Sequence, residues 1–218
     1  MARAAAAPRW QRRPDQRPQA LMASAFKLLL RDGYRRVRLD AIAADAGVSK
    51  ATVYHYFANK DDLLTQSVST RMAEKQRHIE RRLASRTGSA AARLTDYLRQ
   101  FWEMSLTPQA GVWQRLLVSE IVTEAPDVFA AWARGLVQRW RLVARLIREG
   151  QARGEFRRDG DADVAARAII SALSHQALLH VHFGIHRFAR CAPDRLFTST
   201  VEPFLAGLRP PSRRTQSR

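Results

Sequence analysis

The chain has 218 residues, 46% of them hydrophobic, which is enough to bury a core as one large domain or two small ones. Its formal net charge of +17 indicates a polyanionic partner, and its single cysteine, Cys191, excludes an intramolecular disulfide and fits a reducing cytoplasm. Strand patterns are nearly absent, so we predict an all-α fold.

The basic charge is densest toward the N-terminus. Residues 1–60 hold twelve Lys or Arg against four Asp, which leaves a net charge of +8 on about a quarter of the chain. The first 17 residues combine an Ala run with prolines and five arginines, without an apolar period. We therefore expect a disordered basic arm over residues 1–14, which lacks the apolar stretch of a secretory signal. Its arginines either follow DNA phosphates or form a plain solvated tail.

The segment LDAIAADAGVSKATVYHYFANK, residues 39–60, has the pattern of a helix-turn-helix. It follows a first helix predicted from Pro18 to Asp32. A short helix is then expected over Leu39–Ala46, and Gly47 suits the left-handed residue that ends it. Ser49 is a good N-cap for a second helix that runs to about Phe57. An ordinary helical hairpin with a solvated outer face is the competing interpretation.

The second helix is expected to have one inward and one outward face. Val53 would point inward, which leaves Lys50, Thr52, Tyr54 and His55 outward. Polar and aromatic side chains on the outer face of such a helix are suited to reading the major groove of DNA. The pattern therefore predicts a recognition helix.

A further helix is predicted after Phe57, with Asn59 as its cap and an end near Leu83. Its first turn contains Asp61, which is favourable near the positive end of a helix. Lys60 would then stand at a helix N-terminus, where an ammonium and backbone N–H groups can hold one phosphate together. A solvent-exposed lysine is the alternative.

The segments AFKLLLRDGY, IAADAGVSKATVYHYF and NKDDLL, all within residues 17–68, resemble the DNA-binding domain of the TetR/AcrR family of transcriptional regulators. The resemblance implies a three-helix DNA-binding domain over residues 15–75, with its helix-turn-helix at about 38–57. It further implies an effector-binding and dimerisation domain over residues 76–208, which forms a homodimer through its last two helices. A disordered tail is expected over residues 209–218.

The resemblance also implies positions that touch DNA. Together with the outward His55 and with Arg38, the candidate DNA-binding residues are Arg38, Ser49, Lys50, Thr52, Tyr54, His55, Tyr56 and Lys60. Two departures from the family pattern stand out. The stretch Val37-Arg38-Leu39 lacks the hydroxyl that usually opens the first helix of the motif, so that phosphate contact passes to Arg38 or is lost. The position of Tyr56 is more often His.

The remaining chain is predicted to form a helical bundle. Helices are expected over Ala90–Ser105, over Val112–Thr123, from Pro126 to an end at Gly150 and Gly154, from a cap at Asp161 or Asp163 to about Phe183, and from Pro193 to about Leu208. The apolar run Ala168–Ile185 has the length of a membrane span but contains several Ser and His. A buried helix is therefore expected, and no membrane partner.

This bundle is rich in aromatic residues, which favours a pocket for an apolar or aromatic effector. The candidate pocket residues are Trp102, Trp113, Glu120, Phe129, Trp132 and His175. Rings at helical spacing also suit a core, and Glu120 also suits a salt bridge with an arginine. His175, His182 and His186 stand at steps of 7 and 4, on one face of a helix; we interpret them as a pocket or interface wall, and expect no metal.

No pairing of nucleophile and base, glycine-rich phosphate loop or carboxylate pair occurs, so an enzyme is not expected, and neither is a cofactor. The sequence therefore predicts a ligand-responsive homodimeric repressor, cytoplasmic and nucleoid-associated, that a small molecule releases from a palindromic double-stranded DNA operator. A basic architectural protein that coats DNA without sequence preference is the alternative.

Overall fold

The computed structural model describes residues 16–84, 88–188 and 190–210. The predicted basic arm, residues 1–14, and residues 211–218 of the predicted tail lie outside this range. All regular secondary structure of the described residues is helical, which confirms the predicted all-α class. None of the described helices is both long enough and apolar enough to cross a bilayer.

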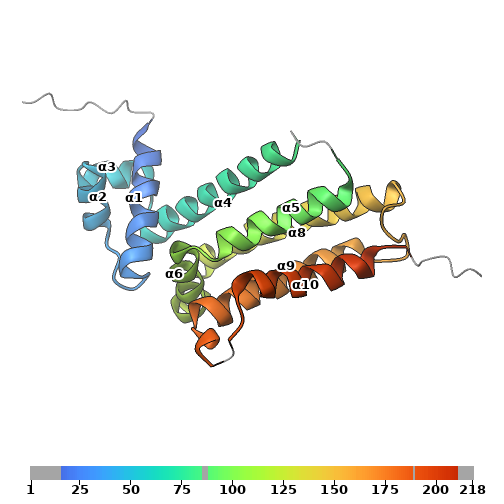
Figure 1. Ribbon diagram of the computed structural model, residues 1–218. Coiled ribbons are helices and arrows are strands. Elements are labelled where there is room, and N and C mark those ends of the chain that lie inside the picture. The colour runs from blue at the N-terminus through green and yellow to red at the C-terminus, as the bar shows by residue number, and fades with distance from the viewer. Residues whose placement is uncertain (1–15, 85–87, 189, 211–218) are drawn as a thin grey trace, which may run out of the picture.

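The N-terminal unit consists of three helices in the predicted order (Figure 1). These are α1 (Arg17–Asp32), α2 (Leu39–Ala46) and α3 (Lys50–Tyr56). The long helix α4 (Lys60–Ala84) then leads from this small unit toward the larger one. Asn59 caps α4 as predicted, because its Oδ1 accepts a hydrogen bond of 2.9 Å from the backbone N–H of Asp62.

The C-terminal unit is a bundle of long helices that lie roughly side by side, with shorter ones at the end nearest the N-terminal unit (Figure 1). Its elements are α5 (Ala90–Ser105), α6 (Pro108–Leu116), the π-helical η2 (Leu117–Ile121), α7 (Val122–Glu124), α8 (Pro126–Ala152), α9 (Ala162–Gln176), the π-helical η3 (Ala177–His182), the short 3₁₀ helix η4 (Ile185–Arg187) and α10 (Pro193–Leu208).

Two helix boundaries differ from the prediction. The second bundle helix begins at Pro108 and not at Val112, because the Thr107 side chain caps it and accepts a hydrogen bond of 3.2 Å from the N–H of Ala110. The helix α8 does not end at Gly150. A Cβ at that position would overlap the Phe156 ring, so the glycine serves close packing inside the helix, which continues to Ala152.

The hydrophobic core has two parts, and their boundary does not follow the predicted domain boundary. One part fills the bundle of α5, α8, α9 and α10. The other combines the buried faces of α1 to α4 with the segment from α6 to the start of α8, through Trp113, Leu117, Ile121, Val128 and Ala131. This segment of the C-terminal unit is therefore packed as part of the DNA-binding unit.

Candidate DNA-binding face and effector cavity

The turn of the helix-turn-helix is built from short-range contacts that the sequence predicts. Gly47 has φ 69°, in the left-handed region, and ends α2. The Ser49 side chain accepts a hydrogen bond of 3.2 Å from the N–H of Thr52, so Ser49 is the N-cap of α3. The hydroxyls of Ser49 and Thr52 lie 2.9 Å apart, which couples two of the candidate DNA-binding side chains before any DNA is bound.

The helix α3 presents the face that a recognition helix needs. Val53 is fully buried, whereas 52% of the Tyr54 surface is exposed and Lys50 and His55 are exposed as well. Thr52, which was predicted to point outward, is half-buried. Tyr56 is also half-buried against the N-terminal core, and its ring meets that of His55 edge-on at 4.8 Å. The outward set is therefore narrower than the candidate list.

Lys50 is paired within the protein. Its ammonium lies 2.8 Å from a carboxylate oxygen of Asp40 on α2, and both side chains are exposed. This hydrogen bond raises the pKa of Lys50. Such an exposed pair contributes little to stability, so a DNA phosphate or base can replace Asp40 at small cost.

Lys60 has a structural partner. Its ammonium donates a hydrogen bond of 3.0 Å to the carbonyl of Tyr34 and lies 4.2 Å from the centre of the Tyr34 ring. The Tyr34 hydroxyl donates to Asp61 at 2.7 Å; burial, and then this bond to Asp61, raise the pKa of Tyr34 to about 12. Lys60 thus ties the loop after α1 to the start of α4. Lys60 is half-buried in this position.

Arg38, the candidate at the entry of the motif, is exposed and immediately precedes α2. Its neighbour in the same loop, Arg35, was not singled out by the sequence patterns. The Arg35 guanidinium is bound to Glu124 of α7, and its backbone N–H donates a hydrogen bond of 3.1 Å to Glu120 of η2. No local pattern reveals this link, because the partners lie far apart in the sequence.

A cavity of about 370 Å³ lies where the two units meet. Residues from α1, α4, α5, α6, η2, α8, α9 and η3 line it. This volume is at the lower end of the range typical of small-molecule sites. Of the six predicted pocket residues, Trp113, Trp132 and His175 line the cavity.

The other three predicted pocket residues lie elsewhere. Trp102 is 1% exposed and packs in the bundle core, 6.4 Å from the Phe197 ring. Phe129 packs against Trp132 from the side of the N-terminal core. Glu120 faces the loop at Gly33 and Arg35. Rings at the same helical spacing thus belong to the core or to the cavity wall according to which helices surround them.

The three histidines do not lie on one continuous helix. His175 lies on α9, while His182 is in η3 and hydrogen-bonds the carbonyl of Ser105 through Nε2 at 2.8 Å. Gly184 then takes a left-handed conformation, so His186 belongs to the separate turn η4. The interruption at Gly184 removes the regular spacing on which the shared face depended.

Three cations that no sequence pattern singled out border the cavity. Arg71 and Lys75 lie one turn apart on α4, and Arg139 projects from α8. Arg71 lies over the Phe26 ring at 5.3 Å and Arg139 over the Phe101 ring at 4.9 Å. Burial, and then the charges of Arg139 and Arg71, lower the pKa of Lys75. The i, i+4 spacing of the α4 pair was visible in the sequence, but its orientation toward a cavity was not.

Comparisons with known proteins agree with this architecture. Residues 21–66 match the family model for bacterial regulatory proteins of the tetR family, and residues 84–187 match the model for a tetracyclin repressor-like C-terminal domain. The transcriptional regulator AcuR of Cereibacter sphaeroides is 33% identical over 159 residues, which cover 69% of each chain.

Two solved structures have the same fold. The transcriptional regulator FadR from Bacillus subtilis, in complex with stearoyl-CoA, has a TM-score of 0.67 at 18% identity, over 87% of this chain and 98% of its own. A protein from Saccharomonospora viridis, in complex with choline, has a TM-score of 0.68 at 23% identity, over 86% of this chain and 95% of its own. The chain therefore belongs to the TetR family of DNA-binding transcriptional regulators, a non-enzymatic family.

Proposed function

We propose that the protein is a homodimeric repressor that a small molecule releases from a palindromic DNA operator. The observation that carries this proposal is the position of the cavity. Its wall includes Phe26 and Leu30 of α1, in the DNA-binding unit, as well as Trp132 and His175 of the bundle. A bound molecule would therefore contact both units and can favour one of their relative arrangements, provided its affinity for the two arrangements differs.

A second set of contacts joins the cavity wall to the loop before α2. Leu117 and Val118 of η2 line the cavity, and Glu120 of the same short element accepts the hydrogen bond from the Arg35 backbone. A shift of η2 on ligand binding would thus act directly on the loop that positions the helix-turn-helix. This supports release by a ligand over a constitutive DNA binder.

The homodimer is proposed to form through α9 and α10. Large apolar side chains are exposed on α9 and in the segment that connects the two helices, namely Val164, Phe183, Ile185 and Phe188, of which Phe188 is 88% exposed. Such a concentration of exposed apolar surface favours burial against a partner. A two-fold dimer would place two α3 helices in successive major grooves, roughly 34 to 36 Å apart or a little more.

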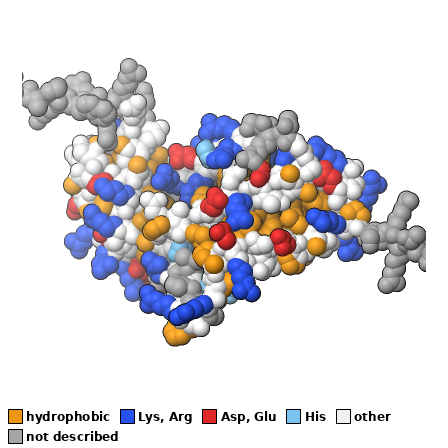
Figure 2. Space-filling model, viewed as in Figure 1, with side chains coloured by type: hydrophobic (Ala, Val, Ile, Leu, Met, Phe, Trp, Pro, Cys, Tyr) orange, Lys and Arg blue, Asp and Glu red, His pale blue; other side chains and the backbone are white. Residues whose placement is uncertain are grey.

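The basic charge of the described residues is not confined to the N-terminal unit. Figure 2 shows Lys and Arg side chains scattered over both units. An architectural binder that coats DNA remains the competing function. The two can be separated by selecting a preferred site from a random DNA pool and measuring its affinity against random sequence at fixed salt. We expect the selected site to bind about 10³-fold or more tightly than random sequence. A difference below about tenfold would favour the architectural binder.

Release by a ligand is tested at the cavity. Ser174 lines it from α9, so Ser174→Phe should fill part of the space and abolish release by any compound that a screen identifies, while operator affinity stays unchanged. Ser174→Ala is the matched control, because it leaves the cavity open. Release that survives Ser174→Phe would place the effector outside this cavity, and light scattering of either variant should still give a dimer.

A further inference from the structure

The cavity has an unbalanced set of charges. Its lining contains Arg71, Lys75 and Arg139 but neither Asp nor Glu among the described residues. Outside the lining, the Glu74 carboxylate lies 3.8 Å from Arg71, and both side chains are about half exposed. That pair is weak and easily exchanged. The cavity therefore presents positive charge without a built-in counter-charge.

Arg139 shows the imbalance most clearly. Its Nε is buried and has no hydrogen-bond partner within the part of the chain that the structure describes. A buried donor of a charged group without an acceptor is unfavourable, since hydrogen bonds to such groups are among the stronger ones in proteins. Gln114 of α6, which also lines the cavity, has a buried Oε1 that likewise finds no partner among the described residues. An acceptor atom of a ligand would satisfy Arg139 Nε, whereas Gln114 Oε1 is itself an acceptor and would need a donor, so only Arg139 favours an anion.

Lys75 adds a second, electrostatic observation. Its pKa is lowered, first by partial burial and then by the charges of Arg139 and Arg71, so its ammonium lies near enough to both guanidinium groups to be repelled by them, although the side chain as a whole is exposed. An anion between them would offset this repulsion. The geometry supplies donors from two helices, α4 and α8, that could converge on one small negatively charged group.

Much of the remaining lining is apolar or aromatic, and its polar members are Ser105, Thr107, Gln109, Gln114, Ser171, Ser174 and His175. Met104, Trp113, Trp132 and Leu136 contribute to the apolar part, together with the Phe101 ring that lies against Arg139. The cavity volume of about 370 Å³ suits a small molecule. A ligand that matches the cations and the apolar part of this lining carries one anionic group and an apolar body.

We propose that the ligand of this cavity is a small carboxylic acid with an aliphatic or aromatic body, whose carboxylate binds between Arg71, Lys75 and Arg139. The identification of this acid as the effector rests on the proposed repressor function. A quaternary ammonium such as the choline held by the Saccharomonospora viridis protein would meet like charges here and no carboxylate.

The charge preference is tested by calorimetric titration of the full chain with ligands that share a body and differ in the polar group. Hexanoate is compared with hexanol and hexylammonium, and phenylacetate with phenylacetamide and phenethylammonium. We expect at least one acid to bind at least tenfold more tightly than its neutral and cationic counterparts. Equal binding of a neutral or cationic counterpart, or no binding of either acid at millimolar concentration, would overturn the proposal.

Variants locate the carboxylate. Arg139→Gln and Lys75→Met should each weaken binding of the acid about tenfold or more, whereas Lys75→Arg, which keeps the charge, should restore most of it. Arg141→Gln is the matched control, because Arg141 is exposed on the same helix as Arg139 and does not line the cavity. Unchanged affinity in both Arg139→Gln and Lys75→Met, with melting temperatures like that of the wild type, would contradict the proposal.

The same ligands added to the protein–operator complex separate this inference from the repressor function. An acid that binds with the expected charge preference but leaves operator affinity unchanged would contradict the ligand-release function and uphold the carboxylate site. Suppose instead that a neutral or cationic compound occupies the cavity and releases the operator, while neither acid binds. This result would contradict the carboxylate site and uphold the ligand-release function.

Discussion

The backbone N–H of Arg35 donates a hydrogen bond of 3.1 Å to the Glu120 carboxylate, which joins residues 85 positions apart in the sequence. The Arg35 side chain reinforces this contact, since its Nε lies 2.7 Å from an oxygen of Glu124, and this bond lowers the pKa of the Glu124 carboxyl. Arg35 is in the loop before α2, and Glu120 is in the π-helical segment that borders the cavity. The link is therefore a direct contact between the cavity wall and the DNA-binding unit.

Glu120→Ala should weaken the response to the effector more than it weakens DNA binding. Removing the acceptor breaks the hydrogen bond between the Arg35 loop and η2. The ratio of the operator dissociation constants measured with and without saturating effector should therefore fall about threefold or more, as expected for a residue that couples two sites. Fluorescence anisotropy with labelled operator measures this ratio. Val122→Ala, at an exposed position just beyond η2, is the control; an unchanged ratio in Glu120→Ala would show that coupling bypasses this contact.

Tyr54→Ala should weaken operator binding without unfolding the protein. The Tyr54 side chain is 52% exposed on the outer face of α3, so the free energy of unfolding should change by no more than about 0.5 kcal/mol. Operator affinity should fall about tenfold, and Tyr54→Phe, which removes only the hydroxyl, tests whether that loss is a phosphate hydrogen bond. Operator affinity equal to that of the wild type would mean that α3 uses another face.

Lys60→Met distinguishes a DNA contact from a structural tie. The ammonium holds the Tyr34 carbonyl, so its loss should lower the free energy of unfolding by about 1 kcal/mol, measured by urea titration. If Lys60 also contacts a phosphate, operator and random DNA should be weakened alike and the salt slope should fall by about one unit. A loss of stability with an unchanged salt slope would mean that Lys60 only holds the Tyr34 carbonyl and does not contact a phosphate.

Gly150→Ala should destabilise the bundle despite the higher helix propensity of alanine. A Cβ at this position overlaps the Phe156 ring, which is 2% exposed, and such overpacking costs typically about 1–3 kcal/mol. Gly207→Ala in α10 is the matched control, because nothing in the same chain lies near the added Cβ. Since α10 belongs to the proposed dimer interface, light scattering must first show an intact dimer; stability should then rise by up to about 1 kcal/mol. Thermal unfolding of both variants measures the difference, and a stabilised Gly150→Ala would refute the packing argument.

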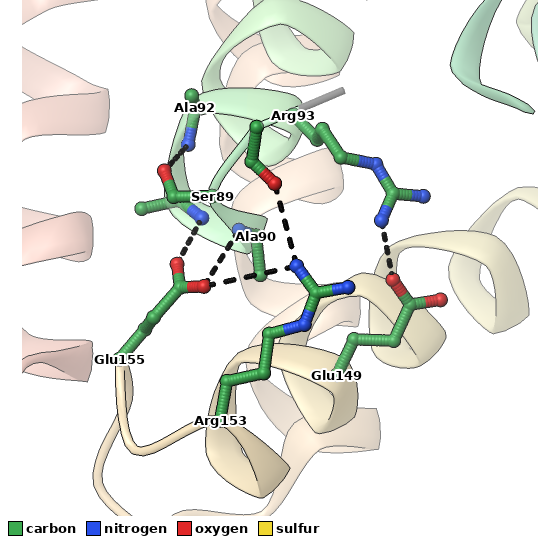
Figure 3. A network of polar contacts seen from close by, with 9 residues as sticks. Ser89, Ala90, Ala92, Arg93, Glu149, Arg153 and Glu155 are labelled. Carbon is green, nitrogen blue, oxygen red and sulfur yellow. Dashed lines mark hydrogen bonds and ion pairs between the residues drawn. The ribbon is translucent and has the colours of Figure 1, made fainter. Parts of the chain in front are cut away.

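Glu155→Gln should lower stability at neutral pH and make little difference in acid. The Glu155 carboxylate accepts hydrogen bonds of 3.0 Å from the N–H groups of Ala90 and Ala91 at the start of α5, with Arg153 beside it (Figure 3). The bonds from Ala91 and Ala90 lower the pKa of this carboxyl in the folded state. Its contribution is therefore full above the unfolded pKa of about 4.3 and is lost as the pH falls through the lower folded pKa.

The expected difference between wild type and Glu155→Gln is about 1 kcal/mol at pH 7, since a neutral amide replaces a charged acceptor. Urea titrations at several pH values should show this difference shrinking below about pH 4. A difference independent of pH would mean that the charge of Glu155 does not matter for the capping of α5.

Local structure followed from the sequence because its causes are short-range. Ser49 caps α3 through a residue three positions away, Gly47 ends α2 by its own backbone freedom, and Pro126 and Pro193 open α8 and α10 as first-turn prolines. The outward position of Tyr54 follows from helical periodicity once Val53 is placed inside. These features, together with the family motif, were enough to identify the DNA-binding unit.

Only the tertiary structure decided which side chains surround the cavity. Trp102 and Trp113 look alike in sequence, yet one lies in the bundle core and the other lines the cavity, because exposure depends on which helices pack over each ring. Arg71 and Arg139 meet at the cavity from helices far apart in the chain, and Arg35 meets Glu120 in the same way. Such contacts depend on how helices cross, a property that no single helix encodes.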